Sequence, residues 1–235
     1  MNIVVVIPAY NEERTVGDVV HKICRLRTTG YRLQVLVVDD GSKDATAKIA
    51  REEGATVLSH PINRGLGAAL STGITAALRL GGDAIVTLDA DDQHDPAEIS
   101  RMIAPIFSGK AEVVIGSRFV ARSPSVGDLA TTMPLSRIGA NFCGNMVTWI
   151  LFGIWVSDSQ SGFRAFSRAA AQKTLLRTST MEVSSEIIKE IARNKFRFQE
   201  VPITVRYTEY SLSKGQGFLR GIDTLWKLIV LKFFR

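Results

Sequence analysis

The segment AIVTLDADDQ, residues 84–93, joins a short apolar run to a group of carboxylates. Residues 84–88 form the kind of continuous, largely apolar run that is typical of a strand buried on both faces of a parallel sheet. Asp89, Asp91 and Asp92 follow it directly. In open parallel sheets, ligands bind beyond the carboxyl ends of the strands. The segment therefore predicts an α/β fold with a functional site at the strand ends.

Other parts of the chain repeat this alternation of strand and helix. Similar apolar runs lie at residues 3–7, 34–38, 56–58 and 113–115. Between them, apolar side chains recur at helical spacing over residues 16–26 and 99–106. We therefore expect a Rossmann-like βαβ series with a mostly parallel sheet flanked by helices.

The second half of the chain departs from this alternation. The expected elements are helices over residues 135–152 and 183–194 and strands over residues 163–166 and 198–205. Residues 120–132 carry Pro, Gly, Ser and Asp without periodicity, which predicts a mobile loop. We expect one domain over residues 1–220, followed by a C-terminal amphipathic helix over residues 221–235.

The composition of the chain excludes several classes of protein. Of 235 residues, 46% are hydrophobic and 22% are charged, and the two cysteines, Cys24 and Cys143, lie far apart. Disordered chains and disulfide-stapled miniproteins do not combine these features. The net charge of +6 favours an anionic partner. Neither a signal peptide nor an uncharged apolar run of about 18 residues is present, so we expect a protein of the reducing cytosol that does not cross a membrane.

Polar clusters follow four of the predicted strands, at residues 8–13, 39–44, 89–93 and 116–118. Asp39 and Asp40 are adjacent carboxylates at the end of a buried strand, and ligand hydroxyl or amide groups would supply the donors they need. Asp89 and Asp91 can share a hard cation such as Mg²⁺ or Mn²⁺ that also takes phosphate oxygens, so a diphosphate ligand follows. The competing interpretation of each cluster is a turn that caps the next helix.

Two features near these clusters are interpreted as structural. Residues 63–67, NRGLG, match no phosphate-binding loop, and we expect Gly67 and Gly73 to allow close packing of a helix. His94 stands alone in a polar stretch, where we expect it to be solvated. No Gly-x-Gly-x-x-Gly follows the first strand, which argues against a dinucleotide-binding oxidoreductase.

Six short motifs together resemble those of one enzyme family. They are PAYNE at residues 8–12, DDGSKD at 39–44, NRGLG at 63–67, DADDQ at 89–93, GSR at 116–118 and SGFR at 161–164. In this order and spacing the chain resembles a family 2 glycosyltransferase of GT-A fold, and most closely the dolichyl-phosphate or polyprenyl-phosphate mannosyltransferase branch. The resemblance implies a metal-dependent, inverting transfer of a hexose from a nucleotide-diphosphate sugar to a polyprenyl or dolichyl phosphate.

The resemblance also implies roles for individual residues. The implied donor-binding residues are Pro8, Ala9, Tyr10, Glu12, Asp39, Asp40, Gly41, Ser42, Asp89, Ala90, Asp91, Gln93 and Arg118. The implied ligands of Mg²⁺ or Mn²⁺ are Asp89, Asp91 and Gln93. The implied acceptor-binding residues are Arg137, Ser161, Arg164, Arg206, Ser213 and Lys214. The implied catalytic residues are Asp91, Arg118 and Asp158.

The acceptor decides whether the reaction needs a base. Cleavage of a nucleotide-sugar bond builds negative charge on the leaving diphosphate, which a divalent cation and cationic side chains stabilise. A phosphate acceptor is already anionic, whereas a hydroxyl acceptor on a glycan or glycolipid needs a carboxylate, for which Asp158 is the candidate. Thr208 stands where the mannosyltransferase branch commonly has Arg, so a uridine-diphosphate sugar competes with GDP-mannose as donor.

The end of the chain predicts contact with a membrane surface. In GIDTLWKLIVLKFF, residues 221–234, Leu225, Trp226, Ile229 and Phe233 fall on one helical face. The segment carries charges and is too short to span a bilayer, so we expect a helix in the lipid interface and a protein bound peripherally at the cytoplasmic face. The alternative is a helix docked on the domain or on a second subunit of a homodimer.

Two other classes of protein are alternatives to this enzyme. A sugar-phosphate nucleotidyltransferase should carry a Gly-rich basic loop after its first strand, where residues 8–13 here are acidic. A non-catalytic domain that binds anionic lipid or nucleic acid should cluster Lys and Arg with aromatic side chains, whereas the basic residues here are scattered. We therefore expect an enzyme with no nucleic-acid partner.

Overall fold

The computed structural model of the protein describes residues 1–120, 135–180 and 182–206. The loop predicted over residues 120–132 lies outside the described residues apart from Val120. The predicted C-terminal helix over residues 221–235 also lies outside them.

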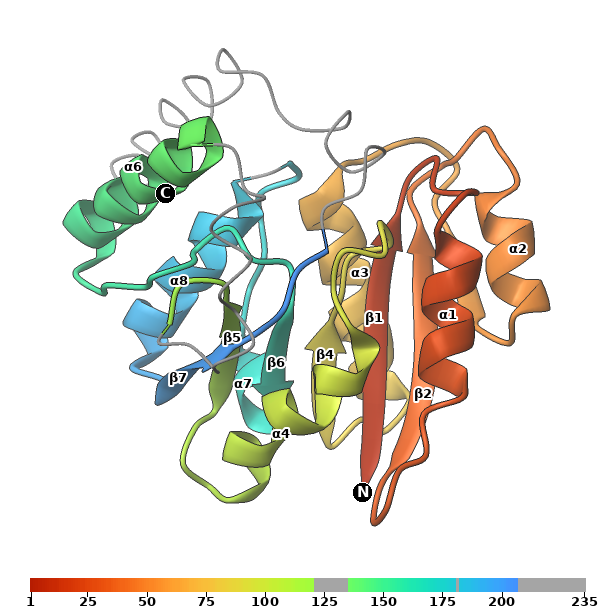
Figure 1. Ribbon diagram of the computed structural model, residues 1–235, viewed down its shortest axis with the longest axis horizontal. Helices are drawn as coiled ribbons and strands as arrows, with labels where there is room; N and C mark the ends of the chain where they lie inside the picture. The colour runs from red at the N-terminus through yellow and green to blue at the C-terminus, as the bar shows by residue number, and fades with distance from the viewer. Residues whose placement is uncertain (121–134, 181, 207–235) are drawn as a thin grey trace.

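A seven-stranded sheet forms the centre of the fold, in the order β3-β2-β1-β4-β6-β5-β7 (Figure 1). The strands are β1 (Asn2–Ala9), β2 (Arg32–Asp39), β3 (Thr56–Ser59), β4 (Ala84–Thr87), β5 (Val113–Ser117), β6 (Arg164–Ser167) and β7 (Phe198–Pro202). Strand β6 pairs antiparallel with both β4 and β5, and the other pairs of neighbours are parallel. The predicted mostly parallel sheet is confirmed.

Two of the predicted strands are shorter than expected. Strand β4 ends at Thr87, before the first carboxylate, and β7 ends at Pro202. The prediction extended the last strand to Val205, which instead makes an isolated antiparallel bridge with His94. The chain therefore leaves the sheet after Pro202 and crosses to the segment that follows β4.

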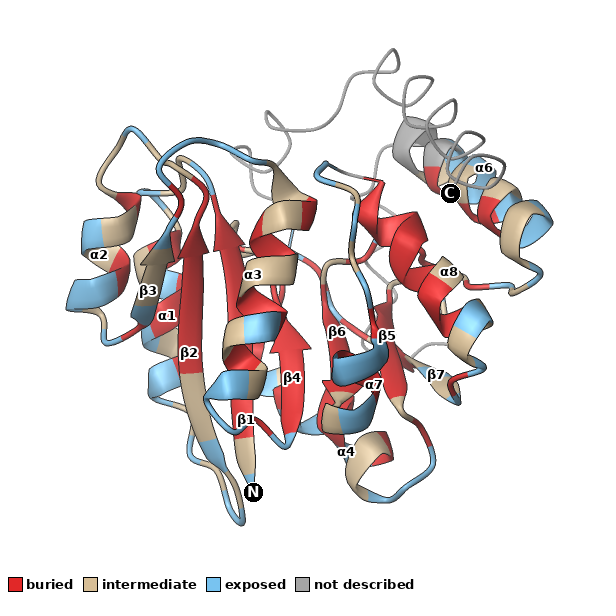
Figure 2. Ribbon diagram, turned by 180° about the vertical axis from the view of Figure 1, so that it is seen from behind, coloured by how far each residue is buried: buried red, intermediate tan, exposed pale blue. Residues whose placement is uncertain are grey.

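Helices cover both faces of the sheet. They are α1 (Val16–Cys24), α2 (Thr46–Glu52), α3 (Leu66–Arg79), α4 (Ile99–Phe107), α6 (Leu135–Phe152), α7 (Arg168–Lys173) and α8 (Val183–Asn194), with a 3₁₀ turn over Pro96–Glu98. Figure 1 shows α1, α2 and α4 in front of the sheet, and Figure 2 shows α3, α7 and α8 on the opposite face. Within the described residues, no helix is long and apolar enough to cross a membrane.

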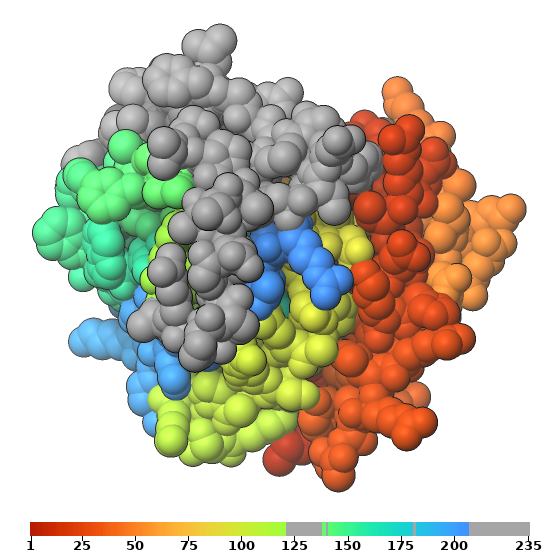
Figure 3. Space-filling view, viewed as in Figure 1, coloured from red at the N-terminus to blue at the C-terminus, as the bar shows by residue number. Residues whose placement is uncertain are grey.

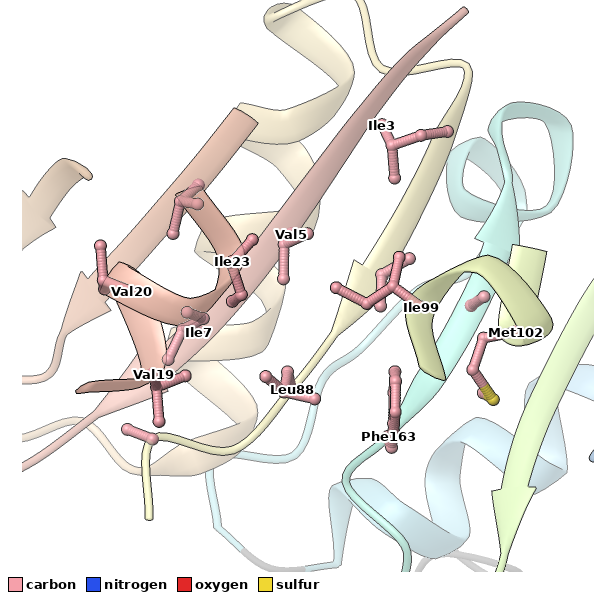
Figure 4. Close-up of a cluster of buried hydrophobic side chains, with 14 of the residues drawn as sticks. Ile3, Val5, Ile7, Val19, Val20, Ile23, Leu88, Ile99, Met102 and Phe163 are labelled. Carbon is pink, nitrogen blue, oxygen red and sulfur yellow. The ribbon is translucent and has the colours of Figure 1, made fainter. Parts of the chain in front are cut away.

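Alternate side chains of the central strands supply two apolar cores. Ile3, Val5 and Ile7 of β1 pack with side chains of α1 and α4, among them Ile23 and Ile99 (Figure 4). Val4 and Val6 point to the other face, where they pack with α3, α7 and α8. Because β1 is covered on both faces, it reads as an unbroken apolar run in the sequence.

Close packing of α3 on the sheet depends on Gly73. A Cβ added at Gly73 would lie 2.2 Å from Cγ1 of Val6 and 3.1 Å from Cγ2 of Val38. The expected helix-to-sheet packing is confirmed for Gly73. Gly67 instead packs against a loop, since its added Cβ would lie 2.0 Å from the carbonyl oxygen of Thr178.

We predict that Gly73→Ala lowers the free energy of unfolding by about 1–3 kcal/mol, because overpacking outweighs the higher helix propensity of Ala. Urea denaturation followed by circular dichroism measures this change. The matched control is Gly139→Ala in α6, where no described atom lies within 4 Å of the added Cβ, and we expect a gain of up to about 1 kcal/mol. A Gly73→Ala protein as stable as the parent would contradict the packing argument.

Candidate functional site

The strands that precede the polar clusters end at the same edge of the sheet. Of the seven strands six end there, among them β1, β2, β4 and β5, and β6 begins there because it runs in the opposite direction. The topology therefore brings the polar clusters that follow β1, β2, β4 and β5 together with the segment that precedes β6. In Figure 3 the blue atoms near residue 200 lie against the yellow segment that follows β4.

The loops that follow β1 and β2 are hydrogen-bonded to each other. Asn11 adopts a left-handed backbone with φ 54°, and its side-chain oxygen accepts a bond from the Lys43 N–H at 2.9 Å. The Asn11 N–H donates to Oγ of Ser42 at 2.9 Å, and the Glu12 N–H donates to Oγ1 of Thr46 at 2.8 Å. The two loops thus form one rigid wall of the site.

The predicted donor residues of this wall differ in how far they reach solvent. Tyr10 is exposed, whereas Pro8, Ala9 and the more distant Ala90 are buried, so only the backbone of these three can meet a ligand. Asp39 is buried, and its Oδ1 accepts a bond from the Ser42 N–H at 3.0 Å.

Asp40 is a buried carboxylate that holds the loop over residues 60–65. Its carboxylate accepts hydrogen bonds from the N–H groups of Arg64 at 2.9 Å and Gly65 at 2.6 Å, and it lies 2.6 Å from Nδ1 of His60. These three contacts supply the donors that a buried carboxylate needs, so we do not retain Asp40 as a donor-binding residue. Gly41, with φ 74°, allows the chain to pass close to the same loop.

Asp89 and Asp91 form the acidic centre of the site. Burial raises the pKa of the Asp89 carboxyl, and the positive charges of Arg164 and Arg118 oppose that rise. Burial and the negative charge of Asp89 raise the pKa of Asp91 to about 6. Glu12 adds a third negative charge that raises both pKa values. Asp89, Asp91 and Glu12 therefore concentrate negative charge at a place that water solvates only in part.

Gln93 orients one of these carboxylates. Its backbone N–H donates to Oδ1 of Asp91 at 3.1 Å, and its side-chain amide donates to Oδ2. These contacts show that Gln93 holds Asp91 in place, and its role as a metal ligand stays a prediction.

The segment before β6 approaches Asp89 closely. A Cβ added at Gly162 would lie 2.1 Å from Oδ2 of Asp89, so only glycine fits there. The carbonyl of Gly162 accepts a bond from Oγ1 of Thr87 at 2.8 Å. Ser161, predicted to bind the acceptor, is buried, and its Oγ accepts the Phe163 N–H at 3.3 Å. The segment is thus a structural support for Asp89.

Arg164 is a buried cation next to the acidic centre. It is 1% exposed, and burial lowers its pKa to about 10 against the opposing charges of Asp89 and Asp158. Its Nη2 donates to the Ser159 carbonyl at 3.0 Å. Arg164 was predicted to bind the acceptor, but its burial prevents direct contact, and its charge instead acts on the site through the carboxylates.

Arg118 and Asp158 form a bidentate ion pair. Nε of Arg118 donates to Oδ2 at 2.6 Å, Nη2 donates to Oδ1 at 2.7 Å, and the backbone N–H of Arg118 donates to Oδ2 at 3.1 Å. The Asp158 side chain is fully buried, so it is not placed to take a proton from an acceptor. Its role is to orient Arg118, which corrects its prediction as a catalytic base.

His94 is buried, so the prediction of a solvated side chain is wrong. Its ring lies 5.4 Å from the ring of Phe163, and its Nε2 is 4.0 Å from Oδ2 of Asp89. Burial lowers the pKa of His94 to about 4. Its Nδ1 has no hydrogen-bond partner among the described residues. A neutral imidazole therefore lines the site beside Asp89.

The remaining predicted acceptor residues come from the second half of the chain. Arg206 is exposed, its N–H donates to the carbonyl of Gln93 at 2.8 Å, and its Nη2 is 3.7 Å from Asp95. Arg137 belongs to α6, and its side chain is not described. Ser213 and Lys214 lie outside the described residues.

Several supporting residues carry no local sequence signal. Nζ of Lys22 lies 2.6 Å from both carboxylate oxygens of Asp92, which has φ 58°, and this pair ties α1 to the loop that holds Asp89. Ser157 bonds to Oε1 of Glu200 through its hydroxyl at 2.6 Å and its N–H at 2.9 Å. Burial raises the pKa of Glu200. These partners are far apart in the sequence, so only the fold reveals them.

Asp89 and Asp91 suit a divalent cation only together with a ligand. In the part of the chain that the structure describes, no group of three or more His, Cys, Asp or Glu side chains could hold a metal ion. Two neighbouring carboxylates that accumulate negative charge nevertheless match the way Mg²⁺ is bound in many enzymes, through one or two carboxylates plus substrate phosphates. The residues therefore fit a cation that arrives with a diphosphate.

Comparisons with known proteins agree with this geometry. The family profile described as Glycosyl transferase family 2 matches residues 4–175. The UDP-N-acetylglucosamine–dolichyl-phosphate N-acetylglucosaminyltransferase of Methanococcus voltae is 36% identical over 249 residues, covering 98% of this chain and 96% of the relative. The polyprenol monophosphomannose synthase of Mycolicibacterium smegmatis is 31% identical over 222 residues, covering 91% and 80%.

A solved structure confirms the predicted GT-A fold. Glucosyl-3-phosphoglycerate synthase from Mycobacterium tuberculosis, in complex with Mn²⁺, UDP and glucosyl-3-phosphoglycerate, superposes with a TM-score of 0.70 at 21% identity, over 97% of this chain and 77% of that one. At this identity the likeness concerns the fold. The match of the family profile to most of the chain, and two relatives above 30% identity, show that this chain belongs to glycosyltransferase family 2.

Proposed function

We propose that this glycosyltransferase moves a hexose from a uridine-diphosphate sugar to a polyprenyl phosphate at the cytoplasmic face of a membrane, with inversion at the anomeric carbon. One observation carries the proposal. The carboxylates of Asp89 and Asp91 lie at the same edge of the sheet as the cations Arg118 and Arg164. Such a mixed cluster suits a cation together with a diphosphate.

The donor diphosphate would meet the acidic centre. Asp89 and Asp91 are the residues that would hold Mg²⁺ or Mn²⁺, and Gln93 would keep Asp91 oriented through its two hydrogen bonds. When bound, the cation supplies positive charge against the phosphate oxygens. Tyr10 is exposed on the wall that also carries Asp39, which supports a site for the base and ribose there.

In the reaction, the bond between the anomeric carbon and the diphosphate oxygen breaks, and the leaving diphosphate keeps the electron pair. A bond from an oxygen of the acceptor phosphate to the same carbon forms. The guanidinium of Arg118, which Asp158 holds in one orientation, supports the charge that grows on the leaving group. Arg164 contributes from its buried position through the electrostatic field.

A phosphate acceptor agrees better with the site than a hydroxyl does. Of the carboxylates discussed for the site, Asp158 is buried and paired, and Asp89 and Asp91 are assigned to the cation, so none of the three is placed as a general base. A phosphate is already anionic and needs no such base. The names of the two relatives, a dolichyl-phosphate and a polyprenol enzyme, support the same acceptor class.

The choice of a uridine nucleotide has two supports. The relative with 36% identity is named for UDP-N-acetylglucosamine, whereas the mannose synthase is 31% identical. Thr208 also replaces the Arg that the mannosyltransferase pattern carries.

Nucleotide binding and sugar transfer test the proposed function directly. We expect UDP with Mn²⁺ to raise the melting temperature more than GDP with Mn²⁺ at equal concentration, because a ligand that binds the native state more tightly stabilises it more. Incubation with labelled UDP-N-acetylglucosamine or UDP-glucose and a polyprenyl phosphate should give a labelled lipid. If GDP stabilised the protein and UDP did not, and the sugar came from GDP-mannose, the proposed uridine donor would be wrong. If sugar were transferred only to a lipid with a hydroxyl group, the proposed phosphate acceptor would be wrong.

A second prediction concerns Asp91. Its pKa rises from an ordinary value of 3.8 to about 6 in the folded protein, so the unfolded chain loses this proton at lower pH. Stability is therefore lost as the pH rises from about 4 to 6, and the loss persists above pH 6. Above pH 6, Asp91→Asn should be more stable than the parent without metal by about 1–3 kcal/mol after allowance for solvent screening, and it should lose transfer and the stabilisation by Mn²⁺ with UDP.

Chemical denaturation at pH 4.5 and pH 7.5 measures the stability difference between the two proteins. Asp18→Asn, which neutralises a carboxylate in the first turn of α1, is the control. If Asp91→Asn were less stable than the parent at pH 7.5 in the absence of metal, the argument about its charge would be wrong.

A third prediction concerns the close approach of Gly162 to Asp89. Gly162→Ala should displace the Asp89 carboxylate and weaken binding of UDP with Mn²⁺ by about tenfold or more, since a methyl group cannot occupy a position 2.1 Å from an oxygen. Gly144→Ala is the matched control, because its added Cβ meets only Nε2 of Gln160 at 3.9 Å. Titration calorimetry of the folded variants measures the effect. If the parent, Gly162→Ala and Gly144→Ala bound UDP with Mn²⁺ equally well, the nucleotide site would not depend on Gly162.

A further inference from the structure

Helix α6 is amphipathic in the reverse sense to a helix of a water-soluble domain. Its buried side chains are polar: Asn141, Asn145 and Thr148 are between 1% and 7% exposed. Its exposed side chains are apolar: Phe142, Met146, Trp149 and Ile150 are between 38% and 63% exposed. Each set recurs at helical spacing, so α6 carries a polar stripe toward the protein and an apolar stripe toward the outside.

The polar stripe anchors α6 to the loop that orients Arg118. The side-chain amide of Asn145 donates to the Ser157 carbonyl at 2.6 Å, and its oxygen accepts the Ser159 N–H at 3.1 Å and the Ser159 hydroxyl at 2.7 Å. Asp158, between these two serines, holds Arg118. Hydrogen bonds thus hold the inner face to the protein, and among the described residues none of the outer apolar side chains belongs to either apolar core.

The apolar stripe continues into an aromatic cluster. Trp155, beyond the end of α6, is 46% exposed, and its ring lies 6.2 Å from Phe142 and 6.3 Å from Trp149 in edge-to-face arrangements. We name Phe142, Met146, Trp149, Ile150 and Trp155 the α6 apolar face. Contiguous apolar patches of this kind mark contacts with a protein or a membrane.

The α6 apolar face lies at the end of the molecule that holds the site. Figure 1 shows α6 at the same end as the carboxyl ends of β1 and β2. From Leu135 to Phe152 the helix sequence holds no Asp or Glu and one Arg, and the chain carries a net charge of +6. An uncharged Trp-rich stripe on a basic protein fits the interface of an anionic bilayer, where Trp prefers the boundary between headgroups and acyl chains.

We propose that the α6 apolar face inserts into the interface of an anionic lipid bilayer, with α6 parallel to the membrane plane, and so brings the Arg118 end of the site to the membrane. The choice of lipid over a second protein copy rests on the proposed function, because a polyprenyl phosphate is itself held in the bilayer. The polar stripe keeps the helix on the protein while the apolar face enters the lipid.

The test measures binding of the full chain to vesicles that contain no polyprenyl phosphate. Vesicles of phosphatidylcholine with about 30% phosphatidylglycerol give an anionic surface. Trp149→Glu with Ile150→Glu should weaken co-sedimentation by about tenfold or more, since each change removes a large apolar side chain from the lipid. Leu80→Glu with Leu175→Glu is the matched control pair, because it places the same two charges on exposed apolar positions outside α6, and it should bind as the parent does.

Fluorescence gives a second, direct measurement. The chain has three Trp residues, so Trp226→Phe leaves only Trp149 and Trp155, both on the α6 apolar face. Entry into the lipid should shift their emission to shorter wavelength, and brominated phospholipids should quench it. This readout does not require a variant of α6 to fold.

The outcomes separate this proposal from the proposed function. Vesicle binding that depends on Trp149 and Ile150, with no transfer to a polyprenyl phosphate, would keep the membrane contact and reject the acceptor. Transfer to a short, water-soluble polyprenyl phosphate that is equal in parent and double variant would show that the variant's site is intact. Equal vesicle binding by parent and double variant, no binding by the parent, no quenching, or a dimer that dissociates in the double variant would each overturn the proposal.

Discussion

The antiparallel insertion of β6 between β4 and β5 is the constraint on which the site depends. A strand that runs against its neighbours begins where they end, so the segment before β6 enters the same edge as the Asp89 loop. Gly162 makes this possible, because any side chain there would overlap the Asp89 carboxylate. The first residue of β6, Arg164, then places a buried guanidinium beside the acids. An all-parallel sheet would carry this cation to the opposite edge.

The charges of the site are unbalanced until a ligand arrives. Burial raises the pKa values of Asp89 and Asp91, and the negative charge of Asp89 raises that of Asp91 further, while Arg118 is already paired with Asp158. Partial burial of two neighbouring carboxylates is costly, even though Gln93 donates two hydrogen bonds to Asp91. In the proposed function a cation and a diphosphate add charges of both signs at this place, beside the wall in which hydrogen bonds join the β1 and β2 loops.

The sequence predicted the site where the chemistry is local and missed it where partners are distant. Apolar runs and the acids behind them predicted the sheet, its functional edge and the Asp89–Asp91 pair. The direction of β6 was not predictable from a four-residue strand. The burial of His94 against Phe163, which directly precedes β6, was therefore not predictable either. Asp40 was predicted to bind a ligand because its donors, at residues 60–65, carry no signal of their own. Asp158 and Arg118 pair across forty residues, which no local pattern reveals.

One short loop connects the reacting end of the molecule with its exposed apolar face. Asn145 holds Ser157 and Ser159, and the residue between them orients Arg118. A helix attached through apolar contacts would have to bury the side chains that α6 presents outward, whereas α6 is held by hydrogen bonds from Asn141 and Asn145, which leave those side chains exposed. The attachment is also directional, because amide and hydroxyl groups bond in fixed geometry. A surface that binds lipid through α6 is therefore held in a defined position relative to Arg118, and an acceptor phosphate at that surface would meet the donor without a separate movement of the domain.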